Sequence, residues 1–367
     1  MQLKRVLKWT AGVVSLALVA AVLFAYWSSD NECDEGNRVP AANPMKAVVY
    51  CDYGSPAVLE IEDVEKPVAT DSQVVVRVRA AAINPLDWHY MRGTPYIGRI
   101  AMGLRKPKDI RIGVDFAGTV ESVGKAVTQF KAGDEVFGGR TGALGQYVAV
   151  NADRAVVLKP VNLSFEQAAA VPVAAVTALE ALRDQGKVQP GQRVLINGAS
   201  GGVGTFAVQI AKAFGAHVTG VCSTRNVELV RGIGADQVVD YTKEDFTTSG
   251  QRYDVIIDNV GNHSLSDLRR VLKPEGKYVM VGGPSGGWID PLPRLLRMFA
   301  YSWFVKEDLR FFIADLNQQN LLVLRDLLVS GKVTPVIDRR YSLGDIREAI
   351  AYLETGRARG KVVVTID

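Results

Sequence analysis

The hydrophobic pattern divides most of the chain into two parts that are built differently. Between Lys46 and Leu158, short β-rich runs such as VVVRVRA and EVFGG alternate with turns that contain glycine and aspartate. This alternation predicts a compact, barrel-like domain of short strands. After Pro160, apolar strands such as RVLIN, HVTGVC and VIIDNV alternate with amphipathic helical stretches. Apolar strands between such helices predict a doubly wound parallel sheet, so the expected fold class is α/β with two domains.

A glycine-rich turn follows the strand RVLIN and opens the next helix. In that helix Val203, Ala207, Ile210 and Phe214 share one face, which is typical of packing on a sheet. Glycines at such a turn let the backbone approach a pyrophosphate, and the helix N-terminus offers free N–H groups to the anion. The strands on either side favour a dinucleotide site over a purely structural turn. The expected cofactor contacts are Ala199, Ser200, Gly201, Gly202, Val203 and Gly204.

The end of the following strand favours NADP(H) over NAD(H). NAD sites usually carry an acidic residue there, but the run 221–226 has none, and the first acid is Glu228. Arg225 can offer a planar fork to a 2′-phosphate, and Ser223 can add a hydroxyl donor. The alternative interpretation of Arg225 is an ordinary solvent-facing arginine.

The N-terminal residues predict a membrane segment. The run Trp9–Trp27 carries no charge and is long enough to cross the ~30 Å hydrocarbon core of a bilayer. Basic residues precede it and acidic residues follow it, so the positive-inside rule places the rest of the chain on the non-cytoplasmic side. A cleaved signal peptide is the main alternative. Residues 28–44 are polar, contain two prolines and are expected to form a linker, and Met45 could start a form without the segment.

Composition narrows the classes of function only slightly. The 367-residue chain has 43 lysines and arginines against 39 acidic residues, and a net charge of +4 gives no basic stripe for nucleic acid. Nucleic acid is therefore not an expected partner. The three cysteines, Cys33, Cys51 and Cys222, form no CxxC pair, so we expect neither a disulfide framework nor a cysteine zinc knuckle.

Residues 45–367 resemble a medium-chain dehydrogenase/reductase of the zinc-free quinone oxidoreductase branch. The resemblance rests on motifs in one order along the chain: MKAVVY, AAINPLDWHYMRG, GVDFAGTVESVG, FKAGDEVFG, AAAVPVAAVTALEAL, NGASGGVG, GADQVVDY, YDVIIDNVG and GRARGKVVV. It implies a GroES-like β-barrel catalytic domain beside a Rossmann domain, with the active site between them. The expected organisation is a membrane anchor 1–27, a linker 28–44, a GroES-like catalytic domain 45–167, a Rossmann NADP-binding domain 168–315 and a C-terminal segment 316–367 that returns to the catalytic domain.

The resemblance also implies roles for single residues. It puts Asn84 and Asp87 at the floor of the active site, although a hydrogen-bonded turn is an alternative role for Asp87. The further cofactor positions that it implies are Thr177 at the nicotinamide carboxamide, Tyr241 near the adenosine phosphate, and Gly261 and Gly282 near the nicotinamide ribose. A half-buried strand tyrosine is the alternative for Tyr241.

Zinc is not expected in this chain. Zinc-dependent relatives carry a cysteine at the position of Asn84 and Gly-His-Glu at the position of Gly113-Val114-Asp115. Two of the three usual catalytic ligands are therefore missing. The run of four closely spaced cysteines that forms a structural zinc lobe is missing as well.

Together these features predict an NADPH-dependent, zinc-independent reductase that transfers hydride to a small hydrophobic acceptor, a quinone or a similar electrophile. Asn84 is the expected hydrogen-bond donor to the developing negative charge. Tyr96 is the candidate proton donor, one residue off the spacing in enoyl-reductase relatives, with Tyr90 a weaker choice. Two alternatives stay open: an alkenal or enoyl reductase, and a non-catalytic, membrane-tethered NADPH-binding adaptor.

Two further expectations concern the surroundings of the protein. The family commonly dimerises through the nucleotide-binding sheet, so a homodimer is possible. The predicted orientation also conflicts with the supply of NADPH, which is scarce outside the cytoplasm. Either the orientation rule fails here, the cofactor is absent in life, or Met45 starts the working form.

Overall fold

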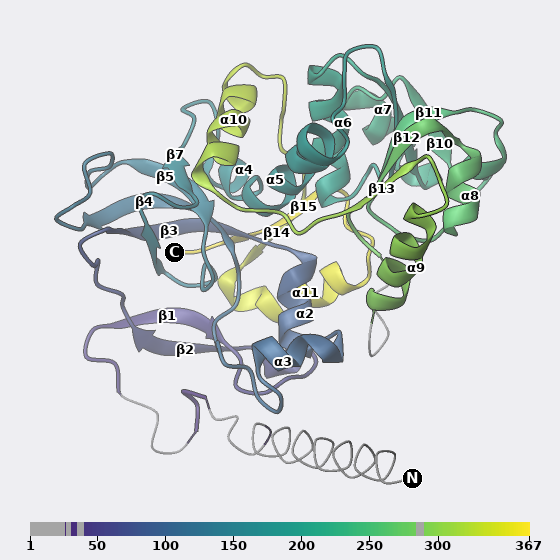
Figure 1. Cartoon of the computed structure of the whole chain (residues 1–367). Coiled ribbons are helices and arrows are strands. Elements are labelled where there is room, and N and C mark those ends of the chain that lie inside the picture. Colours follow the sequence, from purple (N-terminus) through teal and green to yellow (C-terminus); the bar gives the residue numbers. More distant parts are fainter. Residues whose placement is uncertain (1–25, 27–30, 35–39, 284–289) are drawn as a thin grey trace, which may run out of the picture.

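Two large β-sheets, one in each domain, organise the molecule (Figure 1). The computed structural model describes Tyr26, residues 31–34, 40–283 and 290–367. One sheet, on the right of Figure 1, is formed by the middle of the chain. The other, on the left, combines strands from the first half of the chain with two strands near the C-terminus.

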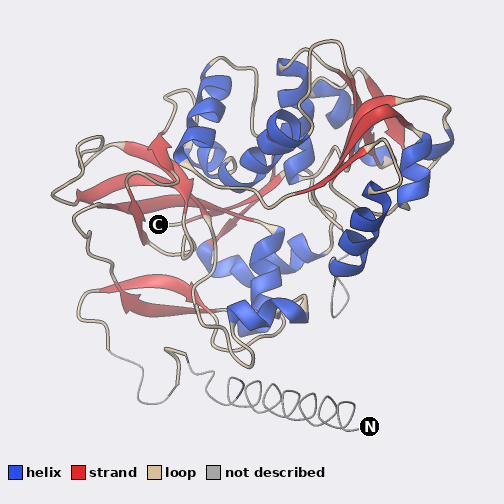
Figure 2. Ribbon diagram, in the orientation of Figure 1, coloured by secondary structure: helices blue, strands red, loops and turns tan. Residues whose placement is uncertain are grey.

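The six-stranded sheet confirms the predicted Rossmann domain. Its strands are β8 Arg193–Asn197, β9 His217–Cys222, β10 Gln237–Asp240, β11 Tyr253–Asp258, β12 Leu272–Met280 and β13 Asp308–Phe311. All of them run parallel in the order β10-β9-β8-β11-β12-β13, which is the order of a dinucleotide-binding sheet. Strands β8, β9 and β11 are mostly buried, because helices cover both faces of the sheet (Figure 2).

The helices of this domain follow the predicted alternation, except that α9 was not predicted. They are α5 Pro172–Glu180, α6 Gly202–Ala213, α7 Val227–Gly232, α8 Leu265–Arg270 and α9 Leu292–Ser302. On α6, Ala207 and Ile210 are fully buried, and Val203 and Phe214 pack against the same core, which confirms the predicted face. Strand β13 was not predicted. It is a four-residue edge strand with no fully buried position, so it lacks the apolar run of the other strands.

The catalytic domain contains a seven-stranded sheet and a separate two-stranded sheet. The strands are β1 Pro44–Val49, β2 Glu60–Glu65, β3 Gln73–Ile83, β4 Asp115–Val123, β5 Glu135–Gly139, β6 Tyr147–Asn151, β7 Val156–Leu158, β14 Ile337–Ser342 and β15 Lys361–Thr365. The larger sheet has the order β14-β15-β3-β4-β5-β7, with β6 paired to β3, while β1 pairs with β2 and makes isolated bridges to Gly145 and Arg111. The helices are α2 Pro85–Arg92, α3 Arg99–Met102, α4 Phe165–Ala169, α10 Gln318–Val329 and α11 Ile346–Glu354.

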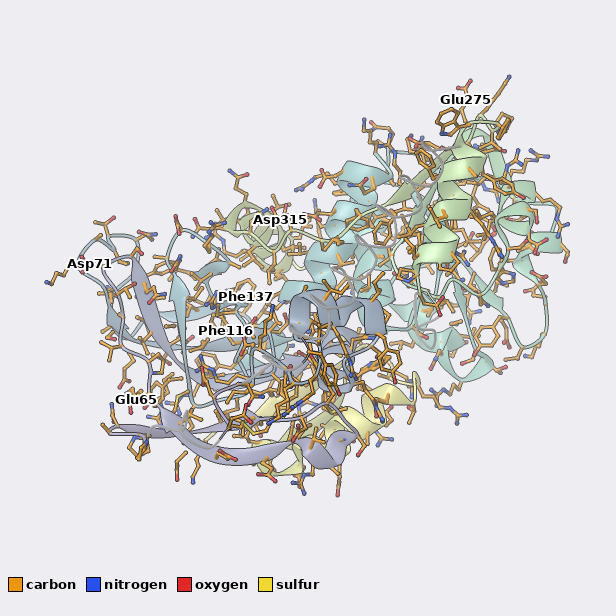
Figure 3. All side chains as sticks on the ribbon, turned by 60° about the horizontal axis from the view of Figure 1, so that its bottom comes forward. Glu65, Asp71, Phe116, Phe137, Glu275 and Asp315 are labelled. Carbon is orange, nitrogen blue, oxygen red and sulfur yellow. A yellow bond between two sulfur atoms is a disulfide. The ribbon has the colours of Figure 1, made fainter. Side chains whose placement is uncertain are left out.

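The catalytic sheet separates two hydrophobic cores. Phe116 on β4 and Phe137 on β5 are both fully buried and lie in the interior of the domain (Figure 3). They belong to different cores. Phe137 lies opposite Ala117, the neighbour of Phe116 on β4, and neighbouring positions on a strand point to opposite faces of the sheet. The core around Phe137 continues through α5 into the Rossmann domain. This shared core joins the two domains and fixes the cleft between them.

The segment predicted as a linker contacts the catalytic domain. Cys33 forms a disulfide with Cys51, which corrects the expectation that these cysteines are unpaired. Beside it, the Asn31 amide donates to the carbonyl oxygens of Cys51 at 2.8 Å and Pro107 at 3.2 Å. The carboxylate of Asp34 pairs with the ammonium of Lys106. Sequence spacing alone could not show this pairing, because it depends on where the fold places position 51.

The predicted membrane span, Trp9–Trp27, lies outside the described residues apart from Tyr26. Among the helices that the structure does describe, none has the length and apolar character needed to cross a bilayer.

The disulfide gives a direct chemical prediction. Alkylation of the denatured, unreduced protein should modify Cys222 alone, and peptide mapping should find Cys33 linked to Cys51. Since the two cysteines lie 18 positions apart, a Cys33→Ser substitution should destabilise the fold by about 3 kcal/mol on the chain-entropy account. Alkylation of Cys33 without prior reduction would contradict the pairing.

Candidate functional site

The predicted nucleotide turn connects β8 to helix α6. Gly198 follows the strand with a φ of +78°, a conformation that favours glycine. At Gly204, a Cβ atom would lie 2.1 Å from the carbonyl oxygen of Gly198, so a larger residue would push the helix away from the strand. At Gly201, the nearest such contact is 3.5 Å, which leaves the backbone open to a ligand. This geometry suits a pyrophosphate at the N-terminus of α6.

A cavity of about 870 Å³ extends from this turn to the floor of the catalytic domain. Its size is within the range of cofactor and substrate pockets. Both domains contribute to its lining: Ile83 and Pro85 come from the catalytic domain, and Val221 and Val260 from the Rossmann domain. The predicted residues that line it are Asn84, Ser200, Gly201, Gly202, Val203, Gly204, Ser223, Arg225 and Tyr241.

The charged residues that line the cavity are all basic. Arg225, Arg357 and Lys361 are its charged residues, and no aspartate or glutamate is found among the described residues of the lining. The guanidinium of Arg225 donates to the carbonyl oxygen of Arg357 at 2.7 Å, which holds it beside the end of β9. The two unshielded arginines at the nucleotide end of the cleft suit the negative charges of a dinucleotide phosphate.

The other predicted residues lie just outside the lining. Ala199 is fully buried within the turn, and the Thr177 hydroxyl donates to the carbonyl oxygen of Val173 at 2.7 Å. The backbone N–H of Gly261 donates to the buried carboxylate of Asp258 at 2.9 Å. At Gly282, a Cβ atom would lie 2.3 Å from the carbonyl oxygen of Asn259, which lines the cavity. These residues support the backbone of the cleft in this structure.

Tyr96 lies apart from Asn84 and the cavity. It begins the short 3-10 helix Tyr96–Gly98, its side chain is 42% exposed, and the guanidinium of Arg99 lies 4.8 Å from its ring centre. Neither Tyr96 nor the exposed Tyr90 belongs to the cavity lining. The structure therefore does not bring either phenol to the floor on which Asn84 lies.

The floor of the cleft is a buried polar cluster around Asn84. The Asn84 amide nitrogen donates to Asp115 at 2.9 Å, and its oxygen accepts a hydrogen bond from the ammonium of Lys361. Lys361 also donates to Asp115 at 3.2 Å and to the carbonyl oxygen of Ile83 at 3.3 Å. The other oxygen of Asp115 accepts the backbone N–H of Val173 at 2.9 Å, at the beginning of α5. Four chain segments, which contain Asn84, Asp115, Val173 and Lys361, thus meet in this cluster.

Asp87 holds the backbone of Asn84 at this floor. It is the third residue of α2, and its carboxylate accepts the backbone N–H of Asn84 at 2.7 Å, which caps the helix. Asp87 is fully buried and does not line the cavity. Burial, together with the nearby Asp115 charge, raises the pKa of Asp87 to about 7. Its hydrogen bond is the capping contact that the alternative interpretation predicted.

Sequence reasoning missed Lys361 and Asp115 as members of the site. Both lie in motifs that carried the family resemblance, GRARGKVVV and GVDFAGTVESVG. A signal for Lys361 was present, because a lysine that opens an apolar strand such as VVV is seldom buried without a partner. Here Lys361 is 3% exposed. Its partners come from positions more than 200 residues earlier in the chain, which no local pattern reveals.

The floor does not fit a catalytic zinc ion. Zinc prefers thiolate, imidazole and carboxylate ligands, whereas this cluster offers one amide, one carboxylate and a lysine ammonium. The positive charge of Lys361 would repel a cation. Across the described part of the chain, no group of three or more histidine, cysteine, aspartate or glutamate side chains is arranged to hold a metal ion.

The fold and the cleft define a two-domain, dinucleotide-binding oxidoreductase. Comparisons with known proteins agree. Residues 70–161 match the family profile of the alcohol dehydrogenase GroES-like domain, and residues 233–364 match the profile named zinc-binding dehydrogenase. The chain therefore belongs to the medium-chain dehydrogenase/reductase family and is quinone oxidoreductase-like. The second profile carries zinc in its name, but the donor set described above differs from a zinc site.

Individual relatives cover nearly the whole catalytic body. The 2-methylene-furan-3-one reductase of Solanum lycopersicum is 37% identical over 90% of this chain and 81% of its own. The chloroplastic NADPH-dependent alkenal/one oxidoreductase of Arabidopsis thaliana is 35% identical over 87% of this chain and 79% of its own. Among solved structures, the quinone oxidoreductase from Coxiella burnetii has a TM-score of 0.76 and 30% identity, covering 89% of this chain and all of that one.

The raised pKa of Asp87 predicts a pH-dependent stability. The folded chain holds a proton on Asp87 from about pH 4, where a free aspartate ionises, up to about pH 7. Stability is therefore lost as the pH rises through this range, because the unfolded chain releases this proton whereas the folded chain must keep it at a buried site beside the Asp115 carboxylate. We expect Asp87→Asn to lose less thermal stability than the wild type between pH 5 and pH 8. An equal change in melting temperature for wild type and Asp87→Asn between pH 5 and pH 8 would contradict the raised pKa of Asp87.

Proposed function

We propose that this protein is an NADPH-dependent reductase of conjugated carbonyl compounds, with quinones or enones as hydride acceptors. The observation that carries the proposal is the single cleft that joins a basic nucleotide turn to an apolar floor with one amide group. The turn supplies backbone N–H groups, the segment after β9 supplies Arg225, and the floor supplies Asn84 between Ile83 and Pro85. The relatives named above support an acceptor of this class.

The residues present fit the cofactor and divide the work between them. The turn Gly201–Gly204 would hold the pyrophosphate, and Ser223, Arg225 and Tyr241 would hold the 2′-phosphate end. When bound, NADPH supplies a hydride to the electrophilic carbon of the acceptor. Negative charge then develops on the carbonyl oxygen, and the Asn84 amide is the donor at the cleft floor that can stabilise it. The cavity reaches the surface beside the exposed Val260, so solvent can supply the proton.

The acceptor class is tested with a panel of compounds. Purified protein is given NADPH with a 2-alkenal, an exocyclic enone and a benzoquinone, and loss of NADPH absorbance is followed with product analysis. We expect turnover with at least one conjugated carbonyl and none with its saturated analogue. A higher kcat/KM for the quinone would indicate a quinone reductase, and a higher kcat/KM for the alkenal would indicate an alkenal or enoyl reductase. Tight NADPH binding without oxidation by any acceptor would contradict the proposal and favour a non-catalytic binding protein.

Substitutions at two predicted residues test the assignment of the floor. Asn84→Ala should lower kcat roughly 10²-fold, the usual effect of removing one donor to a developing oxyanion. Tyr96→Phe should keep most of the turnover, because the phenol lies outside the cavity lining. A large loss of kcat in Tyr96→Phe would instead show that a movement brings this tyrosine to the acceptor.

Arg225 gives a prediction on cofactor choice. Because a hydrogen bond to a charged group contributes about 1.5–3 kcal/mol, Arg225→Ala should raise the KM for NADPH about tenfold to hundredfold. The KM for NADH, which lacks the 2′-phosphate, should not change. Arg231→Ala is the matched control, since Arg231 is exposed, pairs with Glu228 and lies outside the cavity. Equal effects on both cofactors would contradict the proposed role of Arg225.

We also propose that the chain is anchored in a membrane by Trp9–Trp27, with the catalytic body on the non-cytoplasmic side. The uncharged run and the flanking charges support the anchor and its orientation. The Cys33–Cys51 disulfide supports the same side, because disulfides persist in oxidising compartments. The scarcity of NADPH outside the cytoplasm stands against this side.

The membrane proposal is tested on the full chain in isolated membranes. The protein should stay in the pellet after an alkaline carbonate wash, and a variant lacking residues 1–30 should not. Protease added from the non-cytoplasmic face should digest the catalytic body. Release of the full chain by carbonate would contradict the anchor, and protection from that protease would contradict the orientation alone.

A further inference from the structure

The hydrogen bonds of Lys361 account for all three of its ammonium protons. They go to the Asn84 amide oxygen, to Asp115 at 3.2 Å and to the carbonyl oxygen of Ile83 at 3.3 Å. The side chain is 3% exposed, and a Cβ atom at Gly202, in the nucleotide turn, would lie 3.3 Å from its Cδ. Lys361 therefore has no proton directed at an acceptor. Any effect on the reaction must pass through a neighbour.

Asn84 is the neighbour that can pass this effect on. Its amide lies between a group that can only donate, the Lys361 ammonium, and a group that can only accept, the Asp115 carboxylate. This pair fixes which end of the amide is oxygen and which is nitrogen. It also polarises the amide, because an ammonium at the oxygen and a carboxylate at one N–H shift charge in the same direction.

One N–H of Asn84 is left for a ligand. The amide nitrogen carries two hydrogens, and one is used at 2.9 Å by Asp115. The other has only a 3.5 Å contact with the carbonyl oxygen of Ala82, at the limit of a hydrogen bond. Asn84 lines the cavity, so this more weakly bonded N–H is the better candidate of the two to donate to an acceptor oxygen.

We propose that Lys361 is a positioning residue for hydride transfer, which holds and polarises the Asn84 amide so that its second N–H stabilises the oxygen of the acceptor. The inference rests on the proposed reductase function, because it assigns Lys361 a role in that reaction. It gives the buried ammonium a task that binding of the cofactor does not require. This polarisation also makes the Asn84 N–H a stronger hydrogen-bond donor than that of an unpolarised amide.

The backbone around Lys361 holds it firmly in this place. The preceding residue, Gly360, has a φ of +90° and donates its N–H to the carbonyl oxygen of Ser200 at 2.9 Å, within the nucleotide turn. The following residue, Val362, pairs with Ile83 across the sheet. One short stretch of β15 therefore contacts both the cofactor turn and the catalytic floor. A shift of this strand would move the ammonium away from Asn84.

The pair of Lys361 and Asp115 is a poor device for stability alone. Both side chains are almost completely buried, and removing such charges from water costs several kcal/mol per ion before any attraction is gained. Replacing a buried ion pair by neutral groups is often close to neutral for folding. A paired substitution is therefore expected to fold, whereas Lys361→Met alone leaves Asp115 without its counter-charge.

The test is a double-mutant cycle measured in steady-state kinetics. The variants are Lys361→Met, Asp115→Asn with Lys361→Met, Asn84→Ala, and Asn84→Ala with Lys361→Met. We expect Lys361→Met and the paired variant to lower kcat at least tenfold while the Kd for NADPH, measured by fluorescence, changes less than twofold. In the Asn84→Ala background, Lys361→Met should have no further effect on kcat, because its influence passes through that amide.

A matched control separates this role from loss of a buried lysine in general. Lys159 is also a buried lysine of the catalytic domain, pairs with Glu135 at 3.0 Å and lies outside the cavity. Lys159→Met should lower the melting temperature and leave kcat unchanged.

Three results would overturn the inference. The first is an unchanged kcat in the folded variant that carries both Asp115→Asn and Lys361→Met. The second is a loss from Lys361→Met that is equally large with and without Asn84. The third is a weaker Kd for NADPH with kcat unchanged, which would make Lys361 a cofactor ligand. If the wild type fails to oxidise NADPH in the presence of every acceptor tested, the proposed function itself is wrong, and the role of Lys361 in that reaction is wrong with it.

Discussion

The pairing of strand β15 with β3 is the contact on which the cleft depends. These strands lie at opposite ends of the folded chain, and their register sets Val362 opposite Ile83. That register places Lys361 beside Asn84 and Gly360 beside the nucleotide turn. A slip of one residue would reverse the faces of β15 and turn the lysine away from the amide. The C-terminal strand therefore helps to determine the chemistry of a site whose other parts come from residues 83–262 and 353–360.

The cleft separates its two tasks by charge and polarity. Its outer part carries Arg225 and Arg357 and faces the surface, where long basic side chains can meet phosphates without a large desolvation cost. Its floor is apolar apart from one amide and the ion pair behind it. A hydrogen bond in such surroundings is stronger than in water, because little solvent competes for it. In the proposed function, cofactor binding and hydride transfer would therefore use different dielectric environments within one cavity.

Local patterns in the sequence were sufficient for most of the helices and strands and for the nucleotide turn. The strand–turn–helix at Gly198–Gly204 is contiguous, so its spacing alone predicted a geometry that the structure confirms. The disulfide, strand β13 and the ion pair of Lys361 could not be found in this way. Each depends on contacts between distant segments, and β13 lacks the apolar run of a buried strand. For Tyr96, a local pattern predicted a role that the structure does not support. Its spacing nearly matches that of a proton donor, whereas its side chain lies at the surface.

The disulfide at Cys33 has a consequence for how far the catalytic body can move. Asn31 is already held by the catalytic domain, so only four peptide steps separate it from Trp27, the end of the proposed anchor. A fully extended chain of that length reaches about 14 Å. This short connection would keep the catalytic body at the bilayer surface. A free 17-residue linker would instead let it move away from the membrane. An acceptor dissolved in the lipid would meet the enzyme by lateral diffusion in two dimensions.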